Sequence, residues 1–209
     1  MDRRNFLLAL GITFVSASAY SFGNNIRLLT KETDKIAVIY GSRYGATKDT
    51  AEWIAKGIGE GVDILNVESI DLSATVEKYD KFIIGSGIWI DGPHKRLIEL
   101  LSTYTQEMES KIIASFIVCG TTGENEAGKK RIQGYRDRLH TPLSIKPKIH
   151  KHFGGRLIIE KLSEKDRKLL DNFYKNIIKK EFKSWDRTKP ELAEKFGVEL
   201  SALYITSSS

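Results

Sequence analysis

A short apolar run that ends in a glycine-containing, hydroxyl-rich turn and continues at once as a helix constrains this chain most. The run, Lys35–Tyr40, is apolar from its second residue onward and indicates a strand covered on both faces. After the turn, apolar residues recur at helical spacing and predict a helix over Lys48–Gly59. The N–H groups of such a turn and the positive end of the helix point at one spot. The sequence therefore predicts an anion-binding loop.

The turn itself excludes two common nucleotide-binding loops. It reads Ser42-Arg43-Tyr44-Gly45-Ala46-Thr47 and lacks the Gly-Lys-Ser/Thr ending of a nucleoside triphosphatase loop. It also lacks the Gly-x-Gly-x-x-Gly pattern of dinucleotide-binding domains. A plain β-turn in which Thr47 caps the helix is the alternative interpretation.

Strand and helix patterns alternate along the chain. We expect further strands at Val62–Val67, Lys81–Ser86, Lys111–Cys119 and Arg156–Leu162. We expect further helices at Leu72–Tyr79, Pro93–Met108, Glu124–Leu139 and Ser163–Lys180, and a last helix after Pro190 that places Leu192, Ala193 and Phe196 against the domain, with Trp185 beneath it. This alternation predicts an α/β fold, a doubly wound parallel sheet of five strands with helices on both faces and an extra C-terminal helix.

Two more loops carry residues suited to a flat ligand. The loop after the third strand contains Ser86, Gly87, Ile88 and Trp89, where glycine permits close approach and tryptophan can stack. The loop after the fourth strand is small and hydroxylated, Gly120-Thr121-Thr122-Gly123. In a doubly wound sheet these loops and the first turn meet at the carboxyl edge of the strands. A core or interface position is the alternative for Trp89.

The first turn, Ser42-x-Tyr44-Gly45-x-Thr47, resembles the flavodoxin signature. This resemblance implies the strand order 2-1-3-4-5 and flavin mononucleotide (FMN) as cofactor. It implies that backbone amides and hydroxyls hold the FMN phosphate, largely without a cationic side chain, and that the two later loops hold the isoalloxazine ring. The implied phosphate-binding residues are Ser42, Arg43, Tyr44, Gly45, Ala46 and Thr47; those for the ring are Ser86, Gly87, Ile88, Trp89, Gly120, Thr121, Thr122 and Gly123.

Between Lys35 and about Phe196 the chain is similar to flavodoxin-domain proteins related to menaquinone-dependent protoporphyrinogen oxidase. The matching segments are Tyr40–Thr47, Ile84–Trp89, Phe153–Leu157 and Phe182–Asp186. This similarity implies an oxidoreductase whose partner is a membrane quinone or a redox protein. The chain departs from short-chain flavodoxins in being basic, with a formal net charge of +6.

The N-terminal segment has the pattern of an export signal. Met1–Ala19 carries Arg3 and Arg4, an apolar stretch and a small-x-small ending, and it resembles a twin-arginine signal. An uncleaved membrane anchor is the alternative. We therefore expect export, a lead-in over residues 20–34, an FMN-binding domain over 35–182, and a helical extension and tail over 183–209.

Cysteine, histidine and charge narrow the remaining functions. Cys119 is the single cysteine and ends an apolar run, so we expect a buried, inert thiol. His150 and His152 have no carboxylate or cysteine companion, so we interpret them as surface residues and expect no metal site. Lys and Arg cluster, with Tyr135 as the nearby aromatic residue of the first cluster, and this pattern favours a solvated face, an anionic membrane surface or an acidic partner over nucleic acid.

Three functions stay open from the sequence. The first is an FMN-dependent electron carrier outside the cytoplasmic membrane, with no catalytic side chain. The second is a quinone-dependent flavin dehydrogenase of the protoporphyrinogen oxidase type. The third is a flavodoxin fold that has lost flavin and serves as a binding module.

Overall fold

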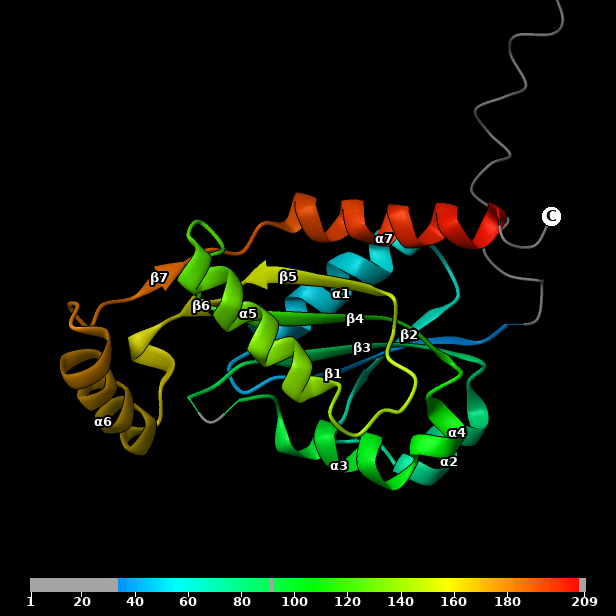
Figure 1. Cartoon of the computed structure of the whole chain (residues 1–209), viewed down its shortest axis with the longest axis horizontal. Helices are drawn as coiled ribbons and strands as arrows, with labels where there is room; N and C mark the ends of the chain where they lie inside the picture. Colours follow the sequence, from blue (N-terminus) through cyan, green and yellow to red (C-terminus); the bar gives the residue numbers. More distant parts are fainter. Residues whose placement is uncertain (1–33, 91, 207–209) are drawn as a thin grey trace, which may run out of the picture.

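The centre of the molecule is a five-stranded parallel sheet, in the order β2-β1-β3-β4-β5 (Figure 1). A computed structural model describes residues 34–90 and 92–206. The predicted strand order is confirmed. The strands are β1 (Ile36–Gly41), β2 (Val62–Asn66), β3 (Lys81–Gly87), β4 (Ile112–Cys119) and β5 (Ile149–Gly154).

Side chains on the central strands alternate between two hydrophobic layers. On one face, Val38, Ile83 and Phe116 pack against α1 (Ala46–Ile58) and α7 (Pro190–Thr206). On the other face, Ile39 and Ile84 pack with residues of the remaining sheet-covering helices. These are α2 (Leu72–Lys78), α3 (Lys95–Thr103), α4 (Thr105–Met108) and α5 (Glu126–Leu139).

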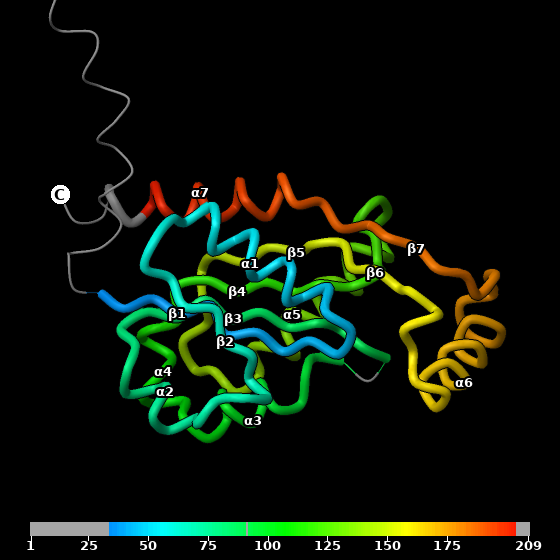
Figure 2. Tube along the Cα trace, turned by 180° about the vertical axis from the view of Figure 1, so that it is seen from behind, coloured from blue at the N-terminus to red at the C-terminus, as the bar shows by residue number. Residues whose placement is uncertain are grey.

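The C-terminal helix completes one of these layers. Helix α7 runs alongside α1 in both views (Figures 1 and 2). Ala193 and Phe196 are buried, as predicted, but Leu192 is 46% exposed, so its predicted contact with the domain is wrong. Gly57 of α1 and Gly197 of α7 face the backbone of the opposite helix, which lets the two helices approach closely.

A smaller unit stands beyond the carboxyl ends of the strands (Figure 2). It contains the antiparallel ribbon of β6 (Arg156–Leu157) and β7 (Trp185–Asp186). Between these strands come a 3-10 turn (Ile159–Lys161), α6 (Glu164–Phe173) and a π-helical turn (Tyr174–Ile178). The predicted helix Ser163–Lys180 therefore ends early as an α-helix, and Ile177 is 68% exposed.

The position of the fifth strand was predicted wrongly. Arg156–Leu162 was expected, but β5 lies at Ile149–Gly154 and pairs with β4. It is an edge strand with exposed His150 and Lys151, so it lacks the continuous apolar run of a central strand. His150 is exposed as predicted, whereas His152 is half-buried and its Nε2 lies 3.4 Å from Cys119 Sγ.

The predicted export signal (Met1–Ala19) and almost all of the lead-in lie outside the described residues, as does the end of the predicted tail. Within residues 34–90 and 92–206, no helix has the length and apolar character needed to cross a membrane.

Substitution of Gly197 with alanine tests the close helix contact. The new Cβ would meet the Ile54 carbonyl and the Gly57 backbone, which cannot move aside as a flexible side chain can. Although alanine favours helix, we expect G197A to lower the free energy of unfolding by about 1–3 kcal/mol. The control is G134A in α5, where a Cβ meets nothing within 4 Å. Chemical denaturation should show G134A to be as stable as wild type or more so; an unchanged G197A would contradict the contact.

His140 gives a second test, through pH. Its Nε2 lies 2.8 Å from Ser115 Oγ in the core, and burial together with nearby Arg136 lowers the pKa of His140 from 6.5 to about 4. The neutral imidazole therefore stabilises the fold fully above pH 6.5, and this contribution is lost as pH falls toward 4. Between pH 7 and 4.5 we expect wild type to lose about 2–3 kcal/mol more unfolding free energy than H140Q, which cannot titrate. Chemical denaturation at pH 7 and 4.5 measures this loss; an equal loss of unfolding free energy in wild type and H140Q would contradict the prediction.

Candidate functional site at the carboxyl edge of the sheet

The predicted anion-binding turn joins β1 directly to α1. Gly45 is the N-cap residue of α1 and has φ 90°, a left-handed conformation that glycine adopts at little cost. Its N–H donates to Ser42 Oγ at 3.0 Å. No described side chain caps α1, so the first N–H groups of the helix lack a side-chain acceptor. Helix α1 therefore begins at Ala46 rather than Lys48, and Thr47 is its second residue rather than its cap.

The loop after β3 lies against this turn. A Cβ on Gly87 would lie 2.6 Å from Thr47 Oγ1, so the two loops are in close contact. The Trp89 and Tyr44 rings are 5.7 Å apart between centroids, and the Arg43 guanidinium carbon lies 4.6 Å from the Trp89 ring centroid. Trp89 and Gly92 exchange two backbone hydrogen bonds, which fold the loop back on itself. The structure thus brings together two of the three predicted loops.

Ser86 and His94 fix the base of that loop. Ser86 is fully buried; its Oγ accepts from the His94 N–H at 2.8 Å and donates to the Gly87 carbonyl at 3.1 Å. His94 packs on Gly41, at the end of β1. Burial lowers the pKa of His94, so its imidazole is neutral at pH 7. Ser86 thus positions the loop, and its hydroxyl already has partners within the protein.

The third predicted loop follows β4, next to β3 in the sheet. The Arg187 guanidinium donates to the Gly120 carbonyl. Trp185 lies against Gly120, because a Cβ there would be 2.7 Å from the indole ring, and its Nε1 donates to Tyr174 Oη at 2.8 Å. Trp185 therefore lies at this edge. The prediction that it packs beneath α7 is wrong. Thr121, Thr122 and Gly123 continue the loop toward α5.

Helix α6 is tied to the anion-binding turn by one buried carboxylate. Asp166 is 3% exposed and accepts two hydrogen bonds from Arg43, at 2.7 and 2.9 Å, and one from the Tyr44 hydroxyl. Burial raises the pKa of Asp166, but these hydrogen bonds outweigh burial and lower the pKa overall. The side chains of Arg43 and Tyr44 are therefore engaged within the protein, which leaves their backbone for a ligand.

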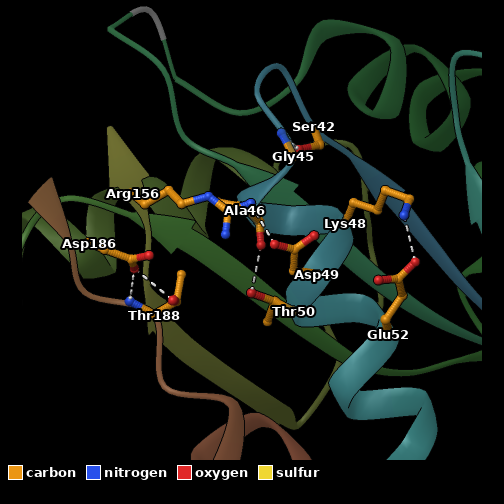
Figure 3. Close-up of polar contacts among 10 residues, drawn as sticks. All are labelled: Ser42, Gly45, Ala46, Lys48, Asp49, Thr50, Glu52, Arg156, Asp186 and Thr188. Atoms are coloured by element: carbon orange, nitrogen blue, oxygen red, sulfur yellow. Dashed lines mark hydrogen bonds and ion pairs between the residues drawn. The ribbon is translucent and has the colours of Figure 1, made fainter. Parts of the chain in front are cut away.

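The sequence analysis did not identify every residue at this edge. Asp166, His94 and Arg187 were missed, because nothing in the local sequence shows that they reach these loops. Arg156 was noted only as part of a matching segment. Its Nη2 lies 3.6 Å from the point where a Gly45 Cβ would stand, and it pairs with Asp49 of α1 (Figure 3).

Two buried polar atoms at this edge indicate a missing partner. In the described chain, the buried side-chain polar atoms without a hydrogen-bond partner are Trp89 Nε1 and His94 Nδ1. Such atoms are costly unless something bonds them. Together with the uncapped start of α1, they fit a ligand that has an anionic group and further polar atoms.

Comparison with known proteins identifies the family. Residues 37–184 match the flavodoxin domain family, and this match covers most of the chain. The chain belongs to the flavodoxin domain family. Its cofactor is FMN and it is a redox flavoprotein, as the sequence resemblance implied. A search of curated proteins found no match for this flavodoxin domain.

Solved structures include flavodoxins that resemble this domain at low identity. One is a flavodoxin, WrbA-like protein from Agrobacterium tumefaciens, with 16% identity, a TM-score of 0.49, and coverage of 83% of this chain and 99% of that chain. Another is oxidised Flavodoxin 1 from Bacillus cereus, with 17% identity, a TM-score of 0.44, and coverage of 80% and 97%. The family assignment rests on the match over residues 37–184.

Removal of the Asp166 carboxylate tests whether α6 organises the predicted anion-binding turn. D166A leaves Arg43, whose side chain is 47% exposed, and Tyr44 without this partner, so we expect unfolding free energy to fall by about 1–3 kcal/mol. FMN affinity should fall about 3- to 10-fold, because binding must then order these side chains. D171A on the same helix removes only an exposed pair with Lys175 and is the control. Fluorescence titration of the apoprotein measures affinity; equal values for both variants would refute the role of Asp166.

Proposed function

We propose that the FMN-binding site is formed by the three loops at the carboxyl edge and that the protein transfers electrons through this flavin. The observation that carries the proposal is the uncapped start of α1 beside Gly87 and Trp89. The N–H groups at the start of α1 and the Ser42 and Thr47 hydroxyls would hold the phosphate. Gly87, Ile88, Trp89 and the loop Gly120–Gly123 would hold the ring.

Two titratable side chains near this edge are unsuited to acid–base or nucleophilic catalysis, which favours an electron carrier. Asp166 is bonded to Arg43 and Tyr44, and its lowered pKa keeps it ionised. Burial raises the pKa of the Cys119 thiol, which therefore remains protonated and unreactive. FMN supplies the redox chemistry when bound, and the protein binds it, orients it and excludes water.

We further propose a place and a partner for this electron transfer. Met1–Ala19 has the sequence pattern of a twin-arginine export signal, which suits a protein that folds around its cofactor before export. We propose work outside the cytoplasmic membrane, with a membrane quinone or a redox protein as partner. The net charge of +6 supports approach to an anionic membrane surface or an acidic partner.

Loss of the loop hydroxyls tests the site. We expect the double variant S42A/T47V to keep the fold and to lose most FMN, because the two hydroxyls proposed to bind the phosphate are removed while the volume of Thr47 is conserved. T50V is the control: Thr50 lies one turn further on, and its hydroxyl donates only to the Ala46 carbonyl, at 2.9 Å. The measurements are visible absorption after reconstitution and thermal unfolding of each apoprotein. Equal flavin retention in all three proteins would refute the assigned site.

The alternative function is a quinone-dependent flavin dehydrogenase of the protoporphyrinogen oxidase type. The segments shared with that group, Tyr40–Thr47 and Ile84–Trp89, favour it. Purified holoprotein should be incubated with protoporphyrinogen and a quinone and followed by porphyrin fluorescence. Direct turnover would establish the dehydrogenase, whereas turnover that needs a protein partner would support the carrier.

A further inference from the structure

Arg156 reaches the start of α1 from a part of the chain more than a hundred residues away. It lies on β6, next to the end of β5, and its Nη2 lies 2.5 Å from Asp49 Oδ2 in the first turn of α1. The same nitrogen lies 3.6 Å from the position of a Gly45 Cβ. Figure 3 shows the guanidinium between the anion-binding turn and Asp49. The Arg156 side chain is 21% exposed, so its charge is only partly screened by solvent.

The ribbon formed by β6 and β7 holds Arg156 in this position. Arg156 lies opposite Asp186 in the antiparallel pairing of β6 with β7. The Gly155 N–H donates to the Cys119 carbonyl at 2.9 Å. The backbone N–H of Arg187 in turn donates to the Gly155 carbonyl at 3.0 Å. These bonds fix the backbone at Gly155, immediately before Arg156, and the Arg156 side chain reaches α1.

Asp49 makes the charge of this arginine important for an anion. A carboxylate in the first turn of α1 stabilises the helix but repels a phosphate bound at the same end. Arg156 neutralises that carboxylate, and further guanidinium N–H groups can donate to another acceptor. The nearby cation Arg43 is bonded to Asp166 and lies over Trp89. The Arg43 side chain is thus already engaged, whereas the Arg156 guanidinium lies beside Gly45.

We propose that Arg156 is a phosphate-binding and specificity-determining residue, which bridges Asp49 and the phosphate group of FMN. The site then selects the phosphorylated flavin over riboflavin through a side-chain cation in addition to the backbone N–H groups and hydroxyls of the turn. This proposal rests on the proposed function, because it assumes that the FMN phosphate binds at the start of α1.

The test compares FMN with riboflavin, which lacks the phosphate, in fluorescence titrations of apoprotein. R156Q should weaken FMN binding about 10- to 100-fold, the range for loss of a charged hydrogen bond, and leave riboflavin affinity unchanged. R156K keeps the charge without the planar fork and should fall between wild type and R156Q. D49N removes the competing carboxylate and should tighten FMN binding while leaving riboflavin unchanged.

A control and a stability measurement separate this role from a structural one. R167Q removes an arginine on α6 that donates to the Ile159 carbonyl, and it should leave the FMN-to-riboflavin affinity ratio unchanged. If Arg156 only ties β6 to α1, R156Q and D49N will lower the melting temperature of the apoprotein and weaken both flavins equally. That result overturns the proposal.

The outcomes also distinguish this proposal from the proposed function. If wild type binds FMN and riboflavin with a ratio that R156Q does not change, the role of Arg156 fails while flavin binding stands. If wild type binds neither flavin, the proposed function fails and the role of Arg156 fails with it. If R156Q cannot be purified folded, the FMN-to-riboflavin affinity ratios of D49N and R156K replace it, because both variants keep a positive charge at position 156. Ratios equal to that of wild type in both variants then overturn the proposal.

Discussion

The arrangement of the candidate site depends on one constraint: the N–H groups at the start of α1 have no side-chain cap. The first turn of a helix leaves N–H groups without acceptors in the helix, and a serine, threonine, aspartate or asparagine cap is preferred because its side chain accepts from one of them. Here the cap residue is Gly45, whose left-handed backbone turns the chain without offering a side-chain acceptor. The unmet donors and the helix dipole make this point favourable for an anion. The parallel pairing of β1 with β3 then places the loop after β3 beside the same point.

The unit between β6 and β7 adds charged contacts to this edge. Asp166 holds Arg43 and Tyr44, and Arg156 pairs with Asp49. Because both pairs join α6 or β6 to the first turn and helix, the unit beyond the sheet and the anion-binding loop are coupled. A substitution in this unit should therefore alter the anion-binding loop as well. The carboxylates of Asp166 and Asp49 are thus both paired with arginines.

Patterns that involve neighbouring residues could be predicted from sequence. The central strands were identified because burial on both faces requires continuous apolar runs, and α3 because Leu97, Leu100 and Leu101 share one face. Edge strand β5 was not identified, because His150 and Lys151 are polar and exposed there and break that pattern. The sequence predicted the turn between β1 and α1, but not the partners of its side chains. Asp166, which lies more than a hundred residues further on, gives no local signal.

By itself the sequence determined the class of fold and, through its family resemblance, the strand order and the FMN cofactor. These depend on local hydrophobic periodicity and on turn residues whose geometry is set by their immediate neighbours. The tertiary structure alone decided that α7 packs on α1, that Trp185 lies against Gly120, and that Arg156 stands beside Gly45. Such contacts join residues far apart in the chain, and the energy that selects them arises only when the folded backbone brings their side chains within reach.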